Sequence, residues 1–143
     1  MVLSVLLYNA ETWTMKAADE SKIRAFEMSV LRRICGVSLR DKWRNDDIKA
    51  LLGIENDVVE KIRRRRLSYF GHVSRMKSDM VPLRMLNGRI HGNRPRGRPR
   101  RNWLDAVEED CRERHITLLQ ACRLTEDRGQ WQKMVSGPPR RST

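Results

Sequence analysis

The amino-acid sequence predicts an all-α protein, a small irregular helical domain of about five to seven short helices. Apolar residues recur with a period near 3.6 in each strongly patterned segment, and no run alternates apolar and polar residues as a half-buried strand does. Residues that favour helix starts and stops bracket these segments. Because 39% of the 143 residues are hydrophobic and 34% are charged, we expect a small core and extended basic surfaces.

Residues 1–90 are predicted to form one helical region, which begins with an apolar strip from Met1 to Leu7. The strip is apolar on nearly every side, as in a buried segment that lacks neighbours within its own chain. It carries no charged n-region and is too short for a secretory signal, which predicts an intracellular location, nuclear or cytoplasmic. We expect such a strip to offer a surface to a protein partner or to a second copy of the chain.

Two helices are predicted next. Asp19 is expected to N-cap the first, and Gly36 to end it in the left-handed conformation. The expected buried face of this helix holds Ile23, Phe26, Val30, Leu31 and Ile34. Asn45 is expected to cap a short second helix that ends at Gly53. The paired acids Asp46 and Asp47 suit the dipole of its first turn better than a metal site, since no third ligand lies nearby in the sequence.

Asp57 is predicted to open the best-patterned helix, whose apolar face includes Val58, Val59, Ile62, Tyr69, Phe70 and Val73. The cationic run of residues 63–66 winds around this helix at 100° per residue. Arg64 is expected to point away from the apolar face, and Arg63 and Arg65 to border it, so these three are candidates for contact with nucleic acid. Arg66 falls in the middle of the face, where it must snorkel, pair with an acid or reach a ligand.

Residues 103–136 are predicted to form a C-terminal helical segment. A short helix within Ser78–Asn87 precedes it. Asn102 is expected to cap a helix with acids in its first turns, Thr117 and Gln120 match a capping box, and Thr125 is expected to start the last helix. Residues 137–143 are predicted to be a disordered tail.

The basic connector, residues 91–102, separates these two regions. Its glycines and two prolines exclude a mid-helix or a central strand, and its cations have no neighbouring acid. Contact with phosphates is the first interpretation. The core Pro95–Pro99 also looks like the AT-hook peptide, in which an Arg-Gly-Arg core enters an A·T-rich minor groove. A passive linker is the third possibility. The candidate binding residues here are Arg94, Arg96, Gly97, Arg98, Arg100 and Arg101.

The remaining chemistry of the sequence is sparse. Cys111 and His115 are four residues apart on one predicted helix, with Cys122 further on, which makes them weak candidates for an incomplete zinc site. The three cysteines are an odd, widely spaced set, typical of free thiols. No phosphate-binding glycine loop, serine nucleophile elbow or cysteine–histidine pair is present, so the sequence predicts neither a cofactor nor catalytic residues.

The net charge is +12 and the isoelectric point is near 10.6. A polyanion is the expected partner of such a protein. RNA or DNA, bound mainly through phosphates, is favoured over a membrane, because the sequence contains no long amphipathic or apolar run.

Five blocks of sequence, in order, carry a resemblance to a known family: Leu6–Trp13, Phe26–Ile34, Arg65–Val73, Gly97–Asp105 and Asp127–Trp131. Together they are similar to the C-terminal region of reverse transcriptases from non-LTR (LINE-like) retrotransposons. In that family the region follows the polymerase palm. The resemblance therefore implies a thumb-like helical part and a downstream basic segment that holds the RNA template and the target DNA.

One departure from the family bears on activity. The Phe/Tyr-x-Asp-Asp motif that binds the catalytic Mg²⁺ is absent, because Asp46 and Asp47 follow Arg44 and Asn45. No endonuclease section is present in the sequence either. The expectation is a nucleic-acid-binding fragment that is not itself an enzyme, and the alternative is a protein interaction or self-association module derived from a retroelement.

Overall fold

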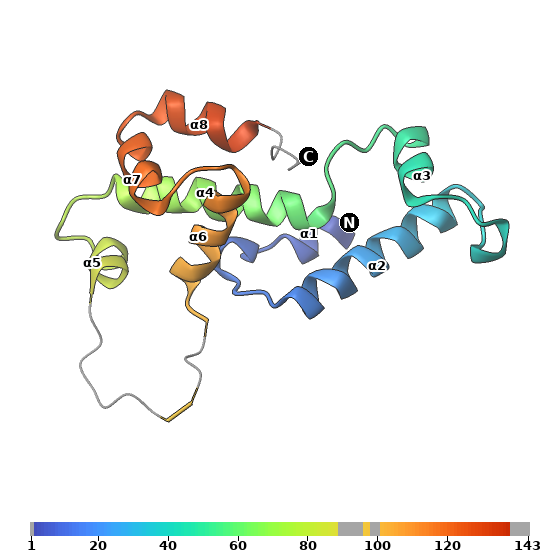
Figure 1. The fold of residues 1–143 in the computed structure, drawn as a ribbon, viewed down its shortest axis with the longest axis horizontal. Helices are drawn as coiled ribbons and strands as arrows, with labels where there is room; N and C mark the ends of the chain where they lie inside the picture. The colour runs from blue at the N-terminus through green and yellow to red at the C-terminus, as the bar shows by residue number, and fades with distance from the viewer. Residues whose placement is uncertain (1, 89–95, 98–100, 138–143) are drawn as a thin grey trace. The chain divides into compact units, whose positions relative to one another are not determined.

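In the computed structural model, residues 2–88, 96–97 and 101–137 are described. They contain eight short α-helices, two 3₁₀ turns and no strand, which confirms the predicted all-α class (Figure 1). Within this part of the chain, no helix is both long enough and apolar enough to cross a lipid bilayer. The chain divides into two compact units, Met1–Tyr8 with Met15–Ile62 and Asn9–Thr14 with Arg63–Thr143. The predicted boundaries at residues 90 and 103 remain predictions.

The first unit contains α1 (Val2–Leu6), α2 (Ala17–Ile34), the 3₁₀ turn η2 (Leu39–Asp41), α3 (Asn45–Leu51) and the first residues of α4 (Val58–Ser74). Figure 1 shows α3 beside the C-terminal end of α2. The small core of the first unit consists of the buried side chains of Met28, Leu31 and Ile48, with Cys35, Leu52 and Ile54 packed against them.

The start of α2 differs from the sequence prediction. The helix begins at Ala17, and Lys16 is the residue before it. Asp19 is not the N-cap but lies in the first turn, where its carboxylate accepts a hydrogen bond from the Lys16 backbone N–H at 3.2 Å. The Asp19 carboxylate therefore reaches back to the Lys16 N–H, a backbone donor at the helix start, as the acid of a capping box does.

The expected buried face of α2 was also wrong in part. Phe26 and Ile34 are 51% and 65% exposed, whereas Glu27, Met28 and Leu31 are buried. Glu27 is buried because its carboxylate accepts hydrogen bonds from the Val58 backbone N–H, at 3.1 and 3.3 Å, where α4 begins. An acid thus satisfies a helix N-terminus from a neighbouring helix, and the buried face of α2 includes a residue that hydrophobicity alone does not predict.

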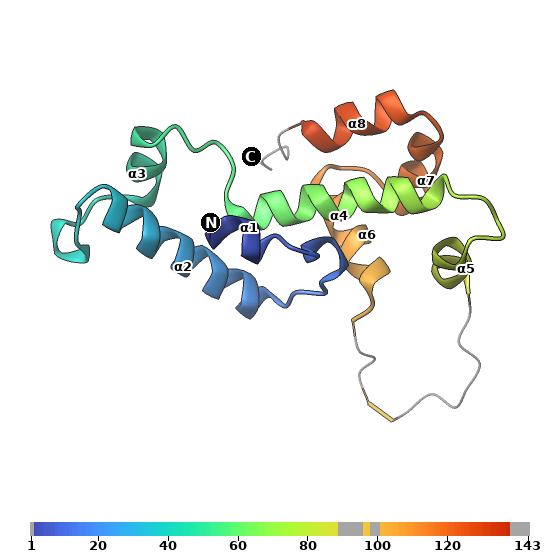
Figure 2. The same cartoon turned by 180° about the vertical axis from the view of Figure 1, so that it is seen from behind.

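The second unit contains η1 (Ala10–Thr12), the rest of α4, α5 (Val81–Asn87), α6 (Trp103–Glu113), α7 (Leu118–Glu126) and α8 (Arg128–Ser136). Seen from behind in Figure 2, α7 and α8 form an adjacent pair joined by a short turn. The core of this unit is formed by Leu67, Phe70, Val107, Cys111, Ala121, Trp131 and Val135.

The predicted helix starts of this unit are partly correct. Thr117 and Gln120 form the expected capping box. Thr125, however, lies inside α7, and the last helix is capped instead by Asp127, whose carboxylate accepts hydrogen bonds from the backbone N–H groups of Gly129 and Gln130. An aspartate can serve as N-cap as well as a threonine does, and Asp127 accepts two donors there.

The dipeptide Gly71-His72 has a structural explanation. Gly71 faces the indole of Trp131, and a Cβ atom at this position would overlap the ring. The indole Nε1–H donates to the Leu67 carbonyl at 3.1 Å, and the ring lies 5.9 Å from that of Phe70. Gly71 therefore allows α8 to pack closely on α4, while His72 is exposed.

Candidate nucleic-acid interface

Arg66 occupies the centre of the apolar face of α4, as the sequence predicts, and it is held there by an ion pair. Only 1% of the residue is exposed. Its Nε and Nη2 donate to the two carboxylate oxygens of Asp110 at 2.6 and 3.0 Å, and its Nη1 donates to the Trp13 carbonyl at 2.8 Å. Burial raises the pKa of the Asp110 carboxyl, while the hydrogen bonds and charge of Arg66 and the charge of Arg63 act against that rise. Arg66 therefore has a structural role.

Arg63 and Arg64, both predicted to contact nucleic acid, are engaged within the second unit. Arg63 pairs with Glu113, and its Nε lies 3.8 Å from an Asp110 oxygen. Its side chain is only 12% exposed. Arg64 donates to the Gly137 carbonyl at 3.4 Å. Arg65 is the member of this run that is exposed to solvent.

The basic connector lies partly outside the described residues, which excludes Arg94, Arg98 and Arg100 from any structural statement. Arg96 and Gly97 are exposed, and Gly97 adopts φ +110°, a conformation that side-chain-bearing residues rarely adopt. Arg101 is also exposed, and it pairs with Glu109 of α6. The described part of the connector thus presents cations to solvent beside a glycine whose backbone geometry a larger residue would strain.

The weak zinc candidates lie in different environments. Cys111 is fully buried in the core of the second unit, and burial raises the pKa of its thiol to about 12. Cys122 is exposed as a residue, but its thiol is partly buried, which raises the pKa of the thiol. His115 follows the end of α6 with φ +59°. No group of three potential ligands occurs in the described residues.

Folding buries more acidic than basic side chains, so the described surface carries a larger share of basic residues than the sequence does. Among the described residues, four acids are buried, namely Glu20, Glu27, Glu60 and Asp110, against two arginines, Arg66 and Arg114. Carboxylates therefore leave the surface in greater number than guanidinium groups, and the chain already carries a net charge of +12.

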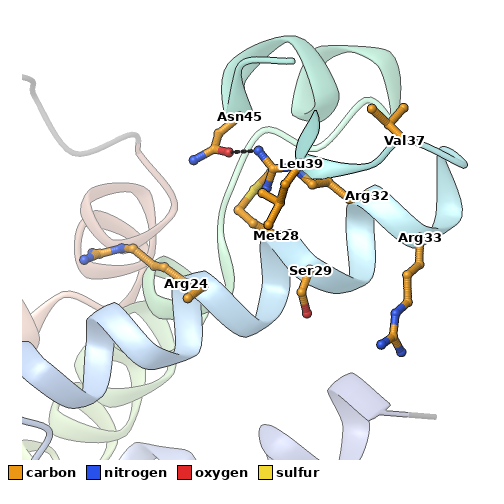
Figure 3. A pocket seen from close by; sticks show the side chains of 9 residues that line it. Arg24, Met28, Ser29, Arg32, Arg33, Val37, Leu39 and Asn45 are labelled. Atoms are coloured by element: carbon orange, nitrogen blue, oxygen red, sulfur yellow. Dashed lines mark hydrogen bonds between the residues drawn. The ribbon is translucent and has the colours of Figure 1, made fainter. Parts of the chain in front are cut away.

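A cationic feature that the sequence did not predict lies in the first unit. A hollow of about 630 Å³ is formed by one side of α2, η2 and the start of α3. Figure 3 shows Arg32 reaching toward Asn45, next to Met28 and Leu39. Arg24 also lines this hollow. We call this feature the arginine hollow. A sequence signal for it exists, because Arg24, Met28 and Arg32 recur every four residues along one helix face.

These features define a small, strongly basic, all-α protein in which several of the expected cations serve the fold. No family model and no solved structure matches the chain. It is similar to an uncharacterized transposon-derived protein of Caenorhabditis elegans, at 26% identity over 143 residues. The match covers 94% of this chain and 51% of that protein, so the chain spans about half the length of its relative.

Proposed function

We propose that this chain is a nucleic-acid-binding helical part of a LINE-like retroelement protein, corresponding to the thumb and downstream region of the reverse transcriptase, and that it does not itself polymerise. The relative of transposon origin supports the retroelement part of this proposal. The resemblance of the five sequence blocks supports the assignment to reverse transcriptases. A location inside the cell, in the nucleus or the cytoplasm, belongs to the same proposal.

The observation that carries the binding function is the charge. A net charge of +12 in 143 residues, with acids preferentially buried, produces a surface that attracts polyanions at long range. In the described part of the connector, Arg96 and Arg101 are exposed. We propose that they contact phosphates, together with Arg65 and with the cations at positions 94, 98 and 100. Such contacts position a protein on a nucleic acid without reading its sequence.

Salt dependence of binding tests this proposal. Fluorescence anisotropy of an A·T-rich duplex, a G·C-rich duplex and an RNA of equal length gives the affinity of the full chain at several salt concentrations. About three to five phosphate contacts on duplex DNA predict a slope of log K against log salt near −3 to −4.5. Replacing Arg96 and Arg98 with alanine is expected to flatten this slope by roughly two and to lower affinity equally on the two duplexes.

Two comparisons sharpen the test. Arg112→Ala with Arg123→Ala removes the same charge from two other exposed arginines, on α6 and α7, and is expected to change the slope less. If the connector is a minor-groove hook instead, the Arg96/Arg98 change erases an A·T preference, and Gly97→Val does nearly as much. If the Arg96/Arg98 change leaves the affinity for every nucleic acid unchanged, phosphate contact and the minor-groove hook are both excluded, and the connector is a passive linker.

Self-association is the second candidate function, favoured by one specific observation. Val5 of α1 and the nearby Tyr8 are 78% and 81% exposed. Large apolar side chains clustered near the chain's start, and left in water, are typical of a surface that binds a partner. Light scattering across a range of protein concentrations tests this candidate, since a self-associating chain gains mass with concentration.

A further inference from the structure

The arginine hollow combines an apolar floor with a cationic wall. Met28, which is 6% exposed, belongs to the core of the first unit and forms part of the floor. Leu39 stands at the edge with 79% of its surface in water. In Figure 3, the Ser29 and Arg33 side chains leave α2 on the side opposite to Leu39 and Asn45. The hollow is within the size range of small-molecule sites.

Its charges are unbalanced. Three arginines, Arg24, Arg32 and Arg33, line the hollow, and none of its lining residues is an acid. The charge of Arg24 is already compensated by Glu20 and Asp57, at 3.6 and 3.3 Å outside the lining, so the excess positive charge of the hollow comes from Arg32 and Arg33. The Arg33 side chain is exposed and makes no hydrogen bond or ion pair within the described residues. Charge complementarity therefore favours an anionic occupant.

Arg32 is preorganised for such an occupant. Its Nη2 donates to the Asn45 side-chain oxygen at 2.7 Å and to the Trp43 carbonyl at 3.4 Å. Both bonds use the same nitrogen, so the Nε and Nη1 donors and the plane of the guanidinium keep their capacity for a ligand. A fixed guanidinium plane beside an apolar floor is an arrangement on which an unstacked nucleobase packs.

We propose that the arginine hollow takes a nucleobase of single-stranded nucleic acid, with Arg32 against the base or its sugar and a neighbouring phosphate on Arg33. This inference rests on the proposed nucleic-acid-binding function and adds to it a preference for unpaired nucleotides. Bases inside a duplex are stacked and cannot enter a hollow of this kind. Asn45 and Ser29 are the uncharged polar residues of the lining, and their side chains already hydrogen-bond to Arg32 and to the Phe26 carbonyl, so we expect a weak preference among bases.

Filling the hollow without changing its charge tests the proposal. Ala25 is exposed on α2 and lines the hollow, so Ala25→Phe places a ring inside it. Ala18 is also exposed on α2 but does not line the hollow. It lies seven residues earlier, on nearly the same helix face, which makes Ala18→Phe the matched control. Circular dichroism establishes that both variants keep the helical content of the parent.

Anisotropy with a 12-nucleotide oligothymidylate and with the same strand annealed to its complement gives the result. Ala25→Phe is expected to weaken binding to the single strand roughly 5- to 150-fold, the fold-change that corresponds to losing one stacked base. Its duplex binding and both affinities of Ala18→Phe are expected to equal those of the parent. Leu39→Ser, at an exposed wall position, is expected to weaken single-strand binding in the same direction.

Three outcomes overturn the proposal. Equal single-strand binding by Ala25→Phe and the parent would show that no base enters the hollow. Equal losses on single strand and duplex would assign the effect to general electrostatics. A change in the oligomeric mass of Ala25→Phe with unchanged affinity would identify the hollow as a protein contact. In each case the parent still binds nucleic acid, whereas failure of the proposed function itself would appear as a parent that binds neither probe.

Discussion

Replacing Arg66 with methionine is expected to destabilise the second unit severely. The substitution keeps an unbranched apolar stem but removes three hydrogen bonds, two to Asp110 and one to the Trp13 carbonyl. It leaves the Asp110 carboxylate buried, with the Nε of Arg63 as a more distant charge at 3.8 Å. Removing one partner of a buried ion pair costs about 3–5 kcal/mol, which is a large fraction of the stability of a small domain.

Two further variants of this pair separate charge from geometry. Arg66→Lys is expected to cost less, about 2 kcal/mol, because the ammonium group keeps the charge beside Asp110 but cannot make the forked contact. The double variant Arg66→Met with Asp110→Leu is expected to recover most of the loss, since neither charge then remains buried alone.

Urea unfolding is the assay, with alkylation of Cys111 as a readout that belongs to the second unit. The Cys111 thiol is fully buried, so it reacts only when that unit opens, and mass spectrometry locates the label. Arg112→Met is the control. It breaks an exposed pair with Glu108 on the same helix, and such pairs contribute about 0.5 kcal/mol or less. An Arg66→Met variant as stable as this control would refute the reasoning.

Three other changes have defined outcomes. Gly71→Ala is expected to destabilise the protein by about 1–3 kcal/mol in thermal melts, although alanine favours helices, because its methyl group overlaps Trp131; a melt at or above that of the parent would contradict this packing. Hydrogen bonds from the backbone N–H groups of Gln130 and Gly129 lower the pKa of the Asp127 carboxyl below 3.8. The stability from this cap is therefore complete above pH 3.8 and is lost as the pH falls through the lower pKa of Asp127 in the folded state. Asparagine has no carboxyl to titrate, so the stability of Asp127→Asn should depend less on pH below pH 4. Acid titrations of the variant and the parent that superimpose would contradict this expectation. Deleting Met1–Leu7 is expected to raise solubility and leave the helical signal by circular dichroism nearly unchanged, and a collapse of that signal would mean that the strip is part of the core.

The helical class and several boundaries could be predicted from the sequence because they depend on local interactions. The 3.6-residue period, the left-handed glycine Gly36 and the Thr117 capping box involve residues within a few positions of one another. The position of Arg66 on the apolar face of α4 follows from helix geometry alone. Interactions between residues this close in the chain can be recognised from the sequence alone.

Only the tertiary structure decided what the charged residues do. That Arg66 pairs with Asp110, 44 positions away, and that Glu27 accepts the first donor of α4, 31 positions away, depends on which helices meet. The same holds for Arg63 and Arg64, which the sequence places among the candidate binding residues and the fold ties to groups from α6 and the end of α8. A cation's partner is set by the packing of distant elements, so a run of arginines in the sequence establishes charge, and the fold determines which of those charges a ligand can reach.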